Sequence, residues 1–212
     1  MTISTVLLAG AGFVLGTQVW FLFEYLLHRF AMHHLHGKGI MSREHLLHHV
    51  AAGWTFSTTH LLSWAGMLLV GWLAWFPLGW VTVSMAFGIS LAIGWSFGYF
   101  FYEYVHAQAH LSAPRNRYQR RLRTHHFHHH FGHPMSNHGV TIRFWDRVFG
   151  TLQEPDQVRV PRRMAQPWML DDVGELLPEY QADDVLVGTR RSSPESNEED
   201  RVAAFASVAP SD

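Results

Sequence analysis

The chain has 212 residues and a formal net charge of −1 at pH 7, which fits one domain of ordinary size and gives no reason to expect a nucleic-acid partner. It holds 17 histidines and no cysteine, so disulfides, thiolate zinc sites and iron–sulfur clusters are excluded. Any bound metal must therefore be held by nitrogen and oxygen ligands.

The first predicted element is a membrane-spanning helix over residues 2–23, TISTVLLAGAGFVLGTQVWFLF, which carry no charge. At about 1.5 Å per residue this stretch is long enough to cross an apolar core of about 30 Å. A cleaved signal peptide is the alternative. It is disfavoured because the stretch lacks a basic start and the helix should continue into Glu24 and His28, which cleavage would remove.

A second apolar region covers residues 61–105 and is broken by WFPLGW at 75–80. Pro77 and Gly79 predict a turn there, so we expect a hairpin of two further membrane-crossing helices. Glycines spaced by four would let helices approach closely. They are Gly12, Gly16, Gly94 and Gly98.

Positive charge predicts the orientation, because Lys and Arg flank the predicted spans but are absent between residues 44 and 114. Both histidine-rich segments should then face the cytoplasm, with the N-terminus and the 75–80 turn outside. We predict an all-α integral membrane protein of about three membrane-crossing helices with a cytoplasmic histidine-rich helical cap. Residues 1–188 would form the membrane-embedded domain and 189–212 a disordered polar tail.

Ten histidines fall into four groups at the predicted cytoplasmic ends of the spans or just beyond them. They are His28 and His33; His45, His48 and His49; His106 and His110; and His126, His129 and His130. Residues three and four apart share a helix face, so three of the groups present a coherent row of imidazoles. The five-residue step from His28 to His33 predicts that the helix bends or ends there. Because one metal takes about four to six ligands, ten imidazoles predict two metals with about five nitrogens each.

Other metal chemistries explain this pattern less well. A single zinc hydrolase would use only three or four ligands, and a soluble-type di-iron bundle needs two Glu-x-x-His motifs where only Glu103 to His106 is found. Glu24 and Glu103 are candidates to orient imidazole N–H groups; the alternative is that both are interfacial charges reaching water. The other seven histidines are expected to be supporting or solvated groups: His34, His36, His60, His125, His128, His133 and His138.

Two non-enzymatic readings compete. A metal transporter would place ionisable ligands near the middle of the membrane, whereas no histidine lies between Thr2 and Leu27 or between Leu61 and Val105. A pH-responsive membrane adaptor would not require the fixed spacing. The histidines gather at one predicted face, which favours a site over a conduit.

The four groups, together with NHGVTIRFWDRVFGTL at 137–152, resemble the fatty acid hydroxylase superfamily, which includes sterol desaturases, sphingolipid hydroxylases and carotenoid hydroxylases. The likeness covers about residues 20–152. The family pattern is a histidine pair with four residues between, an H-x-x-H-H, a membrane hairpin, a pair with three between, a second H-x-x-H-H and a closing W-D-x-x-F-G-T. The ten histidines match it in order, and the close matches Trp145, Asp146, Phe149, Gly150 and Thr151.

Two features depart from the pattern. The run HHFHHH also permits His125, His128 and His129 as the last triad, but the later register is preferred because its distance to Gly139 is more like that of the family. His138 stands where relatives usually carry Phe or Tyr, so it either adds a group able to ligate or replaces a packing ring.

The resemblance implies a dioxygen-dependent enzyme that hydroxylates or desaturates a C–H bond of a lipid at two histidine-bound iron ions, with zinc able to replace iron. An alkyl C–H bond has no acidic proton and no leaving group, which suits a redox metal that activates dioxygen. No catalytic side chain is expected beyond the metal centre, and electrons should come from a separate donor protein. The alternatives are a carotenoid or sterol hydroxylase or desaturase, or a membrane metal-handling protein. The segment 164–177 is expected to lie against the membrane or to cap the domain.

Overall fold

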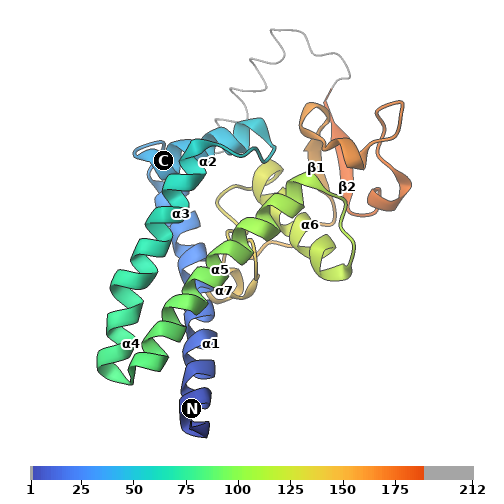
Figure 1. The fold of residues 1–212 in the computed structure, drawn as a ribbon. Helices are drawn as coiled ribbons and strands as arrows, with labels where there is room; N and C mark the ends of the chain where they lie inside the picture. Colours follow the sequence, from blue (N-terminus) through green and yellow to red (C-terminus); the bar gives the residue numbers. More distant parts are fainter. Residues whose placement is uncertain (1, 189–212) are drawn as a thin grey trace. The chain divides into compact units, whose positions relative to one another are not determined.

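The computed structural model describes residues 2–188, which are mainly helical (Figure 1). They form two compact units. The first consists of residues 2–24 and 55–104, and the second of residues 25–54 and 105–188. The predicted polar tail, 189–212, lies outside the described residues.

The first unit is built from four α-helices: α1 (Ile3–Leu26), α3 (Thr58–Val70), α4 (Phe76–Thr82) and α5 (Met85–Leu111), of which α1 and α5 run on into the second unit. Three helical stretches are long and apolar enough to cross a membrane: Ile3–His34, Thr58–Thr82 and Met85–Leu111. Large apolar side chains such as Leu7, Leu62 and Leu73 are exposed, as expected where lipid is the solvent. The three predicted spans are therefore confirmed.

The turn between the second and third spans lies later than predicted. The chain stays helical through 75–80, and the break falls at residues 83–84. Pro77 lies in the first turn of α4, directly after a π-helix, η2 (Gly71–Trp75). Proline has no N–H to donate to the preceding turn, and here it stands where the hydrogen bonding has just changed, so the helix passes it without ending.

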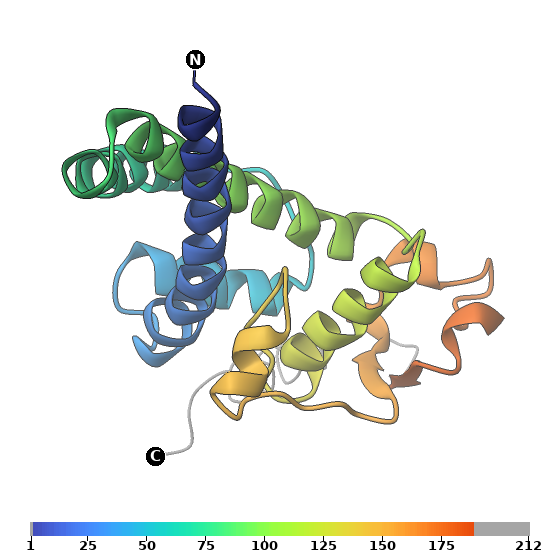
Figure 2. The same cartoon turned by 90° about the horizontal axis from the view of Figure 1, so that it is seen from below.

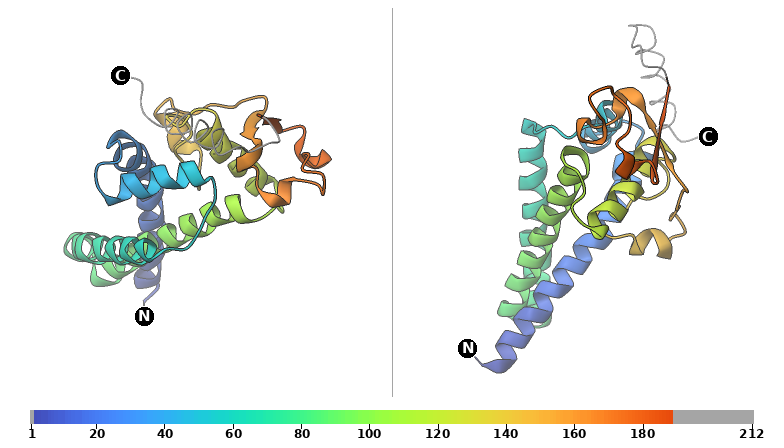
Figure 3. Two further views of the ribbon diagram at one scale, coloured as in Figure 1. Left: turned by 90° about the horizontal axis from the view of Figure 1, so that it is seen from above. Right: turned by 90° about the vertical axis from the view of Figure 1, so that its right-hand side faces the viewer.

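Glycines bring α1 and α5 into close contact. A Cβ atom on Gly16 would lie 2.1 Å from the carbonyl oxygen of Leu91, and one on Gly94 would lie 2.1 Å from that of Phe13. The other side of α5 packs on α3, where the Trp95 indole N–H donates to the Met67 carbonyl at 2.8 Å. Figure 3 shows α5 running beside both neighbours. The close approach predicted from the glycine spacing is thus confirmed.

The second unit combines short helices with a small sheet. In chain order it contains a π-helix η1 (Leu27–His34), α2 (Ile40–Ala51), the end of α5, α6 (Arg117–Phe131), α7 (Phe144–Val148), β1 (Val158–Pro161), 3-10 turns η3 (Arg162–Met164), η4 (Pro167–Met169) and η5 (Pro178–Tyr180), and β2 (Asp184–Val187). β1 and β2 are parallel, with Val158 opposite Asp184.

Residues 158–187, which we call the C-terminal segment, lie beside α6 (Figure 2). They share a hydrophobic core with this helix. This core contains Phe127, Val158, Val160, Met169, Leu176 and Tyr180. Strands of four residues are too short to show a periodicity in the sequence, so the sheet was not predicted. The stretch 164–177 forms 3-10 turns and a single β-bridge rather than an α-helix, and it caps α6.

Candidate metal centre

The five-residue step between His28 and His33 is explained by the π-helix η1. A π-helix forms hydrogen bonds between residues five apart instead of four, so positions i and i+5 come to lie one above the other. Both imidazoles are buried and lie side by side, with ring centroids 5.2 Å apart. The spacing predicted a bend or an end here; the chain instead continues with a wider turn that aligns this pair.

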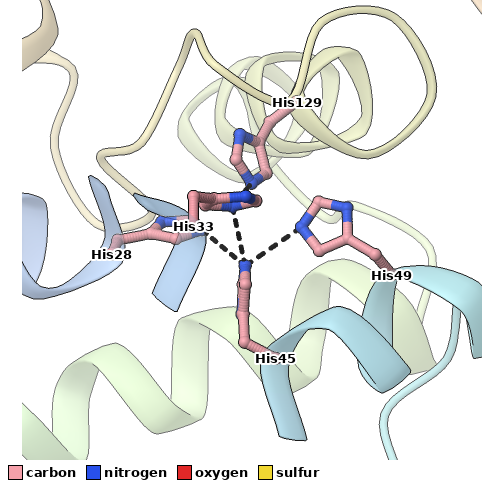
Figure 4. A group of neighbouring side chains, drawn as sticks. All are labelled: His28, His33, His45, His49 and His129. Atoms are coloured by element: carbon pink, nitrogen blue, oxygen red, sulfur yellow. Dashed lines mark hydrogen bonds between the residues drawn. The ribbon is translucent and has the colours of Figure 1, made fainter. Parts of the chain in front are cut away.

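Five histidines converge in what we call the first histidine group: His28, His33, His45, His49 and His129. They come from η1, α2 and α6, and one nitrogen of each lies within 4.8 Å of the others (Figure 4). The Nε2 atom of His45 stands 3.0 Å from that of His28, 2.9 Å from that of His33 and 3.0 Å from that of His49. All five side chains are buried.

Hydrogen bonding does not account for this arrangement. An Nε2 atom has either one proton or one lone pair, so that of His45 cannot bond to three identical atoms at once. Two nitrogens bound to one ion at about 2.1 Å and at right angles to each other would be about 3.0 Å apart. The observed separations therefore fit five residues that could hold one cation between them.

Backbone carbonyls fix the tautomer of several imidazoles. His28 Nδ1 donates to the carbonyl of His138 at 2.5 Å, and His129 Nδ1 donates to the carbonyl of Ser136 at 2.7 Å. A carbonyl only accepts, so the proton is on Nδ1 and the Nε2 lone pair points into the group. This tautomer leaves Nε2 able to bind a metal.

The second histidine group consists of His48, His106, His110, His126 and His130, again with ligand atoms within 4.8 Å of one another. Its members come from α2, α5 and α6. The Nε2 atoms of His106 and His48 are 2.9 Å apart, as are those of His110 and His126. His48 Nδ1 donates to the Gly53 carbonyl at 2.9 Å, which directs its Nε2 inward as well.

Consecutive histidines explain why the two groups adjoin. Neighbouring residues on a helix point about 100° apart, so His48 and His49 on α2 serve different groups, as do His129 and His130 on α6. The rings of His49 and His130 stack with centroids 4.1 Å apart and join the groups. The H-x-x-H-H pattern is thus suited to two neighbouring ions.

Burial also prepares these imidazoles for ligation. Desolvation, reinforced by neighbouring imidazoles, holds the pKa values of five of them well below the usual range: His45, His49, His126, His129 and His130. They are therefore neutral at physiological pH, and a neutral imidazole offers its lone pair to a cation.

The alternative histidines belong to neither of the two histidine groups. His125 Nε2 donates to the Asp146 carboxylate at 3.1 Å, and the His128 ring faces Gln153 at 2.9 Å. The His138 ring lies beside the first histidine group, 5.5 Å from the His28 ring between centroids. Glu24 and Glu103 belong to the first unit, where the Glu103 carboxyl is hydrogen-bonded to Tyr99. Their proposed action on the imidazoles stays a prediction.

Asp146 organises the loop behind the first histidine group. It accepts the backbone N–H of His138 and of Gly139, each at 2.8 Å, and the Thr151 hydroxyl at 2.8 Å, in addition to His125. Burial alone would raise the pKa of this carboxyl, but the His125 contact and the other donors hold it below its ordinary value. Asp146 therefore holds His125 as well as the backbone of this loop.

Backbone groups are the functional elements that sequence reasoning missed. The carbonyls of Ser136 and His138 orient two imidazoles, yet every residue has a carbonyl and no residue type reveals its use. The neighbouring Asn137 offers an indirect signal, because its φ of +57° is a conformation that Asn tolerates better than most residues.

Comparison with known proteins agrees with this geometry. A family model described as fatty acid hydroxylase matches residues 13–151. A solved structure described as full-length scs7p, in which only the hydroxylase domain is visible, is similar with a TM-score of 0.54 and 28% sequence identity, over 71% of this chain and 58% of that one. None of the curated proteins matches the chain. The chain belongs to the fatty acid hydroxylase family.

Proposed function

We propose that this protein is a dioxygen-dependent membrane oxidoreductase that hydroxylates, or desaturates, a C–H bond of a lipid at a histidine-bound di-iron centre. The observation that carries the proposal is the pair of adjacent five-histidine groups with Nε2 atoms directed inward. Family membership supports lipid hydroxylation. The solved structure supports it too, although this chain spans 58% of that chain's length.

Each part of the site has a physical role in such a reaction. The ten Nε2 lone pairs would hold two cations, and their all-nitrogen character suits iron or zinc. Two iron ions bound there would supply the dioxygen activation that no acid or base side chain can provide. The carbonyls of Ser136, His138 and Gly53 hold imidazoles in the ligating tautomer. Burial of the histidines keeps water away from the reacting centre.

The same proposal extends to the partners and the location. The lipid substrate would reach the site from the bilayer, because three helices are long and apolar enough to cross it. The asymmetry of Lys and Arg supports a cytoplasmic site. A separate electron-donor protein on that side would supply the reducing equivalents.

The test is mass spectrometry of total lipids from cells expressing the wild type or His129→Ala, with an electron donor supplied. His129 belongs to the first histidine group, so we expect a lipid to gain one oxygen with the wild type and not with the variant. Loss of two hydrogens would identify a desaturase instead. His133→Ala is the matched control, because this histidine is exposed. Identical lipid profiles for the wild type and His129→Ala in several hosts would reject the proposal.

A further inference from the structure

The C-terminal segment, residues 158–187, lies beyond the part of the chain that matches the family model, 13–151. It nevertheless contacts the three helices that carry the second histidine group. These helices are α2 with His48, α5 with His106 and His110, and α6 with His126 and His130.

The contact with α6 is made through a buried ion pair. The Arg123 guanidinium is 1% exposed and donates to the Asp184 carboxylate at 2.7 Å. It also lies over three aromatic rings: Phe127 at 5.4 Å, Trp168 at 5.9 Å and Tyr180 at 5.3 Å from their centroids. Because this buried cation would lose its partners if it moved, its contacts fix the position of α6 against the C-terminal segment.

The contacts with α5 and α2 use the ends of these helices. The last carbonyls of a helix have no partner within it, so side chains from outside must satisfy them. The Trp168 indole N–H donates to the His110 carbonyl at 2.9 Å, one residue before α5 ends. The Gln166 side-chain amide donates to the carbonyl of Ala52, the C-cap residue of α2.

We propose that Trp168, supported by Gln166, is a positioning residue that sets how tightly the second histidine group holds its metal. The proposal rests on the proposed function, which places two metals in the two groups. Trp168 acts directly on His110, and α5 contributes ligands only to the second group. The π-helix η1 contributes His28 and His33, which belong only to the first group. His28 donates a hydrogen bond to the carbonyl of His138. The helix end that Trp168 holds therefore belongs to the one histidine-bearing helix, α5, that serves the second group alone.

The experiment uses full-length protein in detergent, reconstituted with Co²⁺ and then dialysed against a chelator of graded concentration. Trp168→Phe keeps an aromatic ring beside Arg123 but removes the N–H that reaches His110. We expect one of its two cobalt ions to be lost at a chelator concentration at least ten-fold lower than for the wild type, with the other unchanged. Trp80→Phe is the matched control, because it removes an indole from an exposed position in α4. Gln166→Leu should shift in the same direction.

Reference variants identify the ion that is lost. His33→Ala damages only the first group and His106→Ala only the second, so the residual Co²⁺ absorption spectrum of Trp168→Phe should match that of His106→Ala. Two equally retained ions in Trp168→Phe would overturn the inference. Loss of both ions together with a lower melting temperature would also overturn it, since the role would then be general stability. A wild type that binds no pair of ions would instead count against the proposed function.

Discussion

At the scale of single residues, the two nitrogens of each imidazole have different roles. Where Nδ1 donates to a backbone carbonyl, as in His28 and His129, the Nε2 lone pair is left for a cation. The carbonyl that accepts from Nδ1 therefore contributes to the site through the histidine that it orients. Asp146 acts indirectly: its carboxylate accepts hydrogen bonds from the loop whose carbonyls orient these rings.

Asp146 is not a member of the first histidine group. Asp146→Asn should nevertheless disturb the group, because it weakens the loop that orients His28 and His129. The N–H groups of His138 and Gly139 donate to different oxygens of Asp146. An asparagine has one acceptor oxygen, so its amide hydrogens would face one of these two N–H groups and leave it without an acceptor. We expect a loss of about 2 kcal/mol or more in stability, as for other buried donors left unpaired, and weaker binding of one metal. Thermal unfolding and metal content of the purified variant check both effects.

His138→Phe is the control for this prediction, since the contribution of His138 comes from its backbone, which both donates to Asp146 and accepts from His28. The variant should retain two metals and full stability, because a phenyl ring suits a buried position at least as well as an imidazole. Equal damage from the two substitutions would contradict the assignment of the Asp146 role.

Residue identity made the ten histidines recognisable, because their number and spacing follow helix geometry. Two sets of about five were predicted from the count, but which histidines join which set was not, since that depends on which faces of α2, α5 and α6 meet. The spacing alone also left two registers open for the last triad. The structure brings His126, His129 and His130 into the groups, while His125 turns to Asp146. Their role as ligands stays a prediction until a metal is observed.

At the scale of elements, local deviations from the α-helix account for the steps that a regular helix does not explain. The five-residue step in η1 and the proline in α4 both depart from simple helical patterns, and both coincide with a π-helical stretch. Sequence rules based on a period of 3.6 read such steps as bends or turns. The predicted bend at 28–33 and the predicted turn at 75–80 were wrong, because the chain forms a wider helical turn in or beside each place and does not end the helix.

The contact between α1 and α5 provides a test at this scale. Gly16→Val should destabilise the protein by about 1–3 kcal/mol, because a Cβ atom there would lie 2.1 Å from the Leu91 carbonyl oxygen and the helices would have to separate. Gly10→Val on the same helix is the matched control, since nothing lies within 4 Å of its Cβ position. Thermal unfolding in detergent measures the difference. A similar melting temperature for the two variants would contradict this packing.

At the scale of the whole molecule, the distribution of charge decides which side of the membrane holds the site. The absence of Lys and Arg between residues 44 and 114 leaves the loop between the second and third spans without a basic residue to retain it. Basic residues follow the first and last spans, and moving them across would be costly, at about 2.5–3.5 kcal/mol each at the membrane centre. The histidines lie in the same segments as these basic residues, so the orientation of the spans also determines the side on which the histidines lie.

The protein's lack of cysteine makes this orientation directly measurable. Two exposed valines suit single cysteine substitutions: Val81, 84% exposed near the end of α4, and Val173, 68% exposed in the C-terminal segment. Each cysteine would show on which side of the membrane its segment lies. We expect a membrane-impermeant maleimide to label Val81→Cys in intact cells and Val173→Cys only after permeabilisation. The cysteine-free parent should show no labelling in either condition. The reverse pattern would place the histidines outside, away from a cytoplasmic electron donor, and the proposed reaction would need another source of electrons.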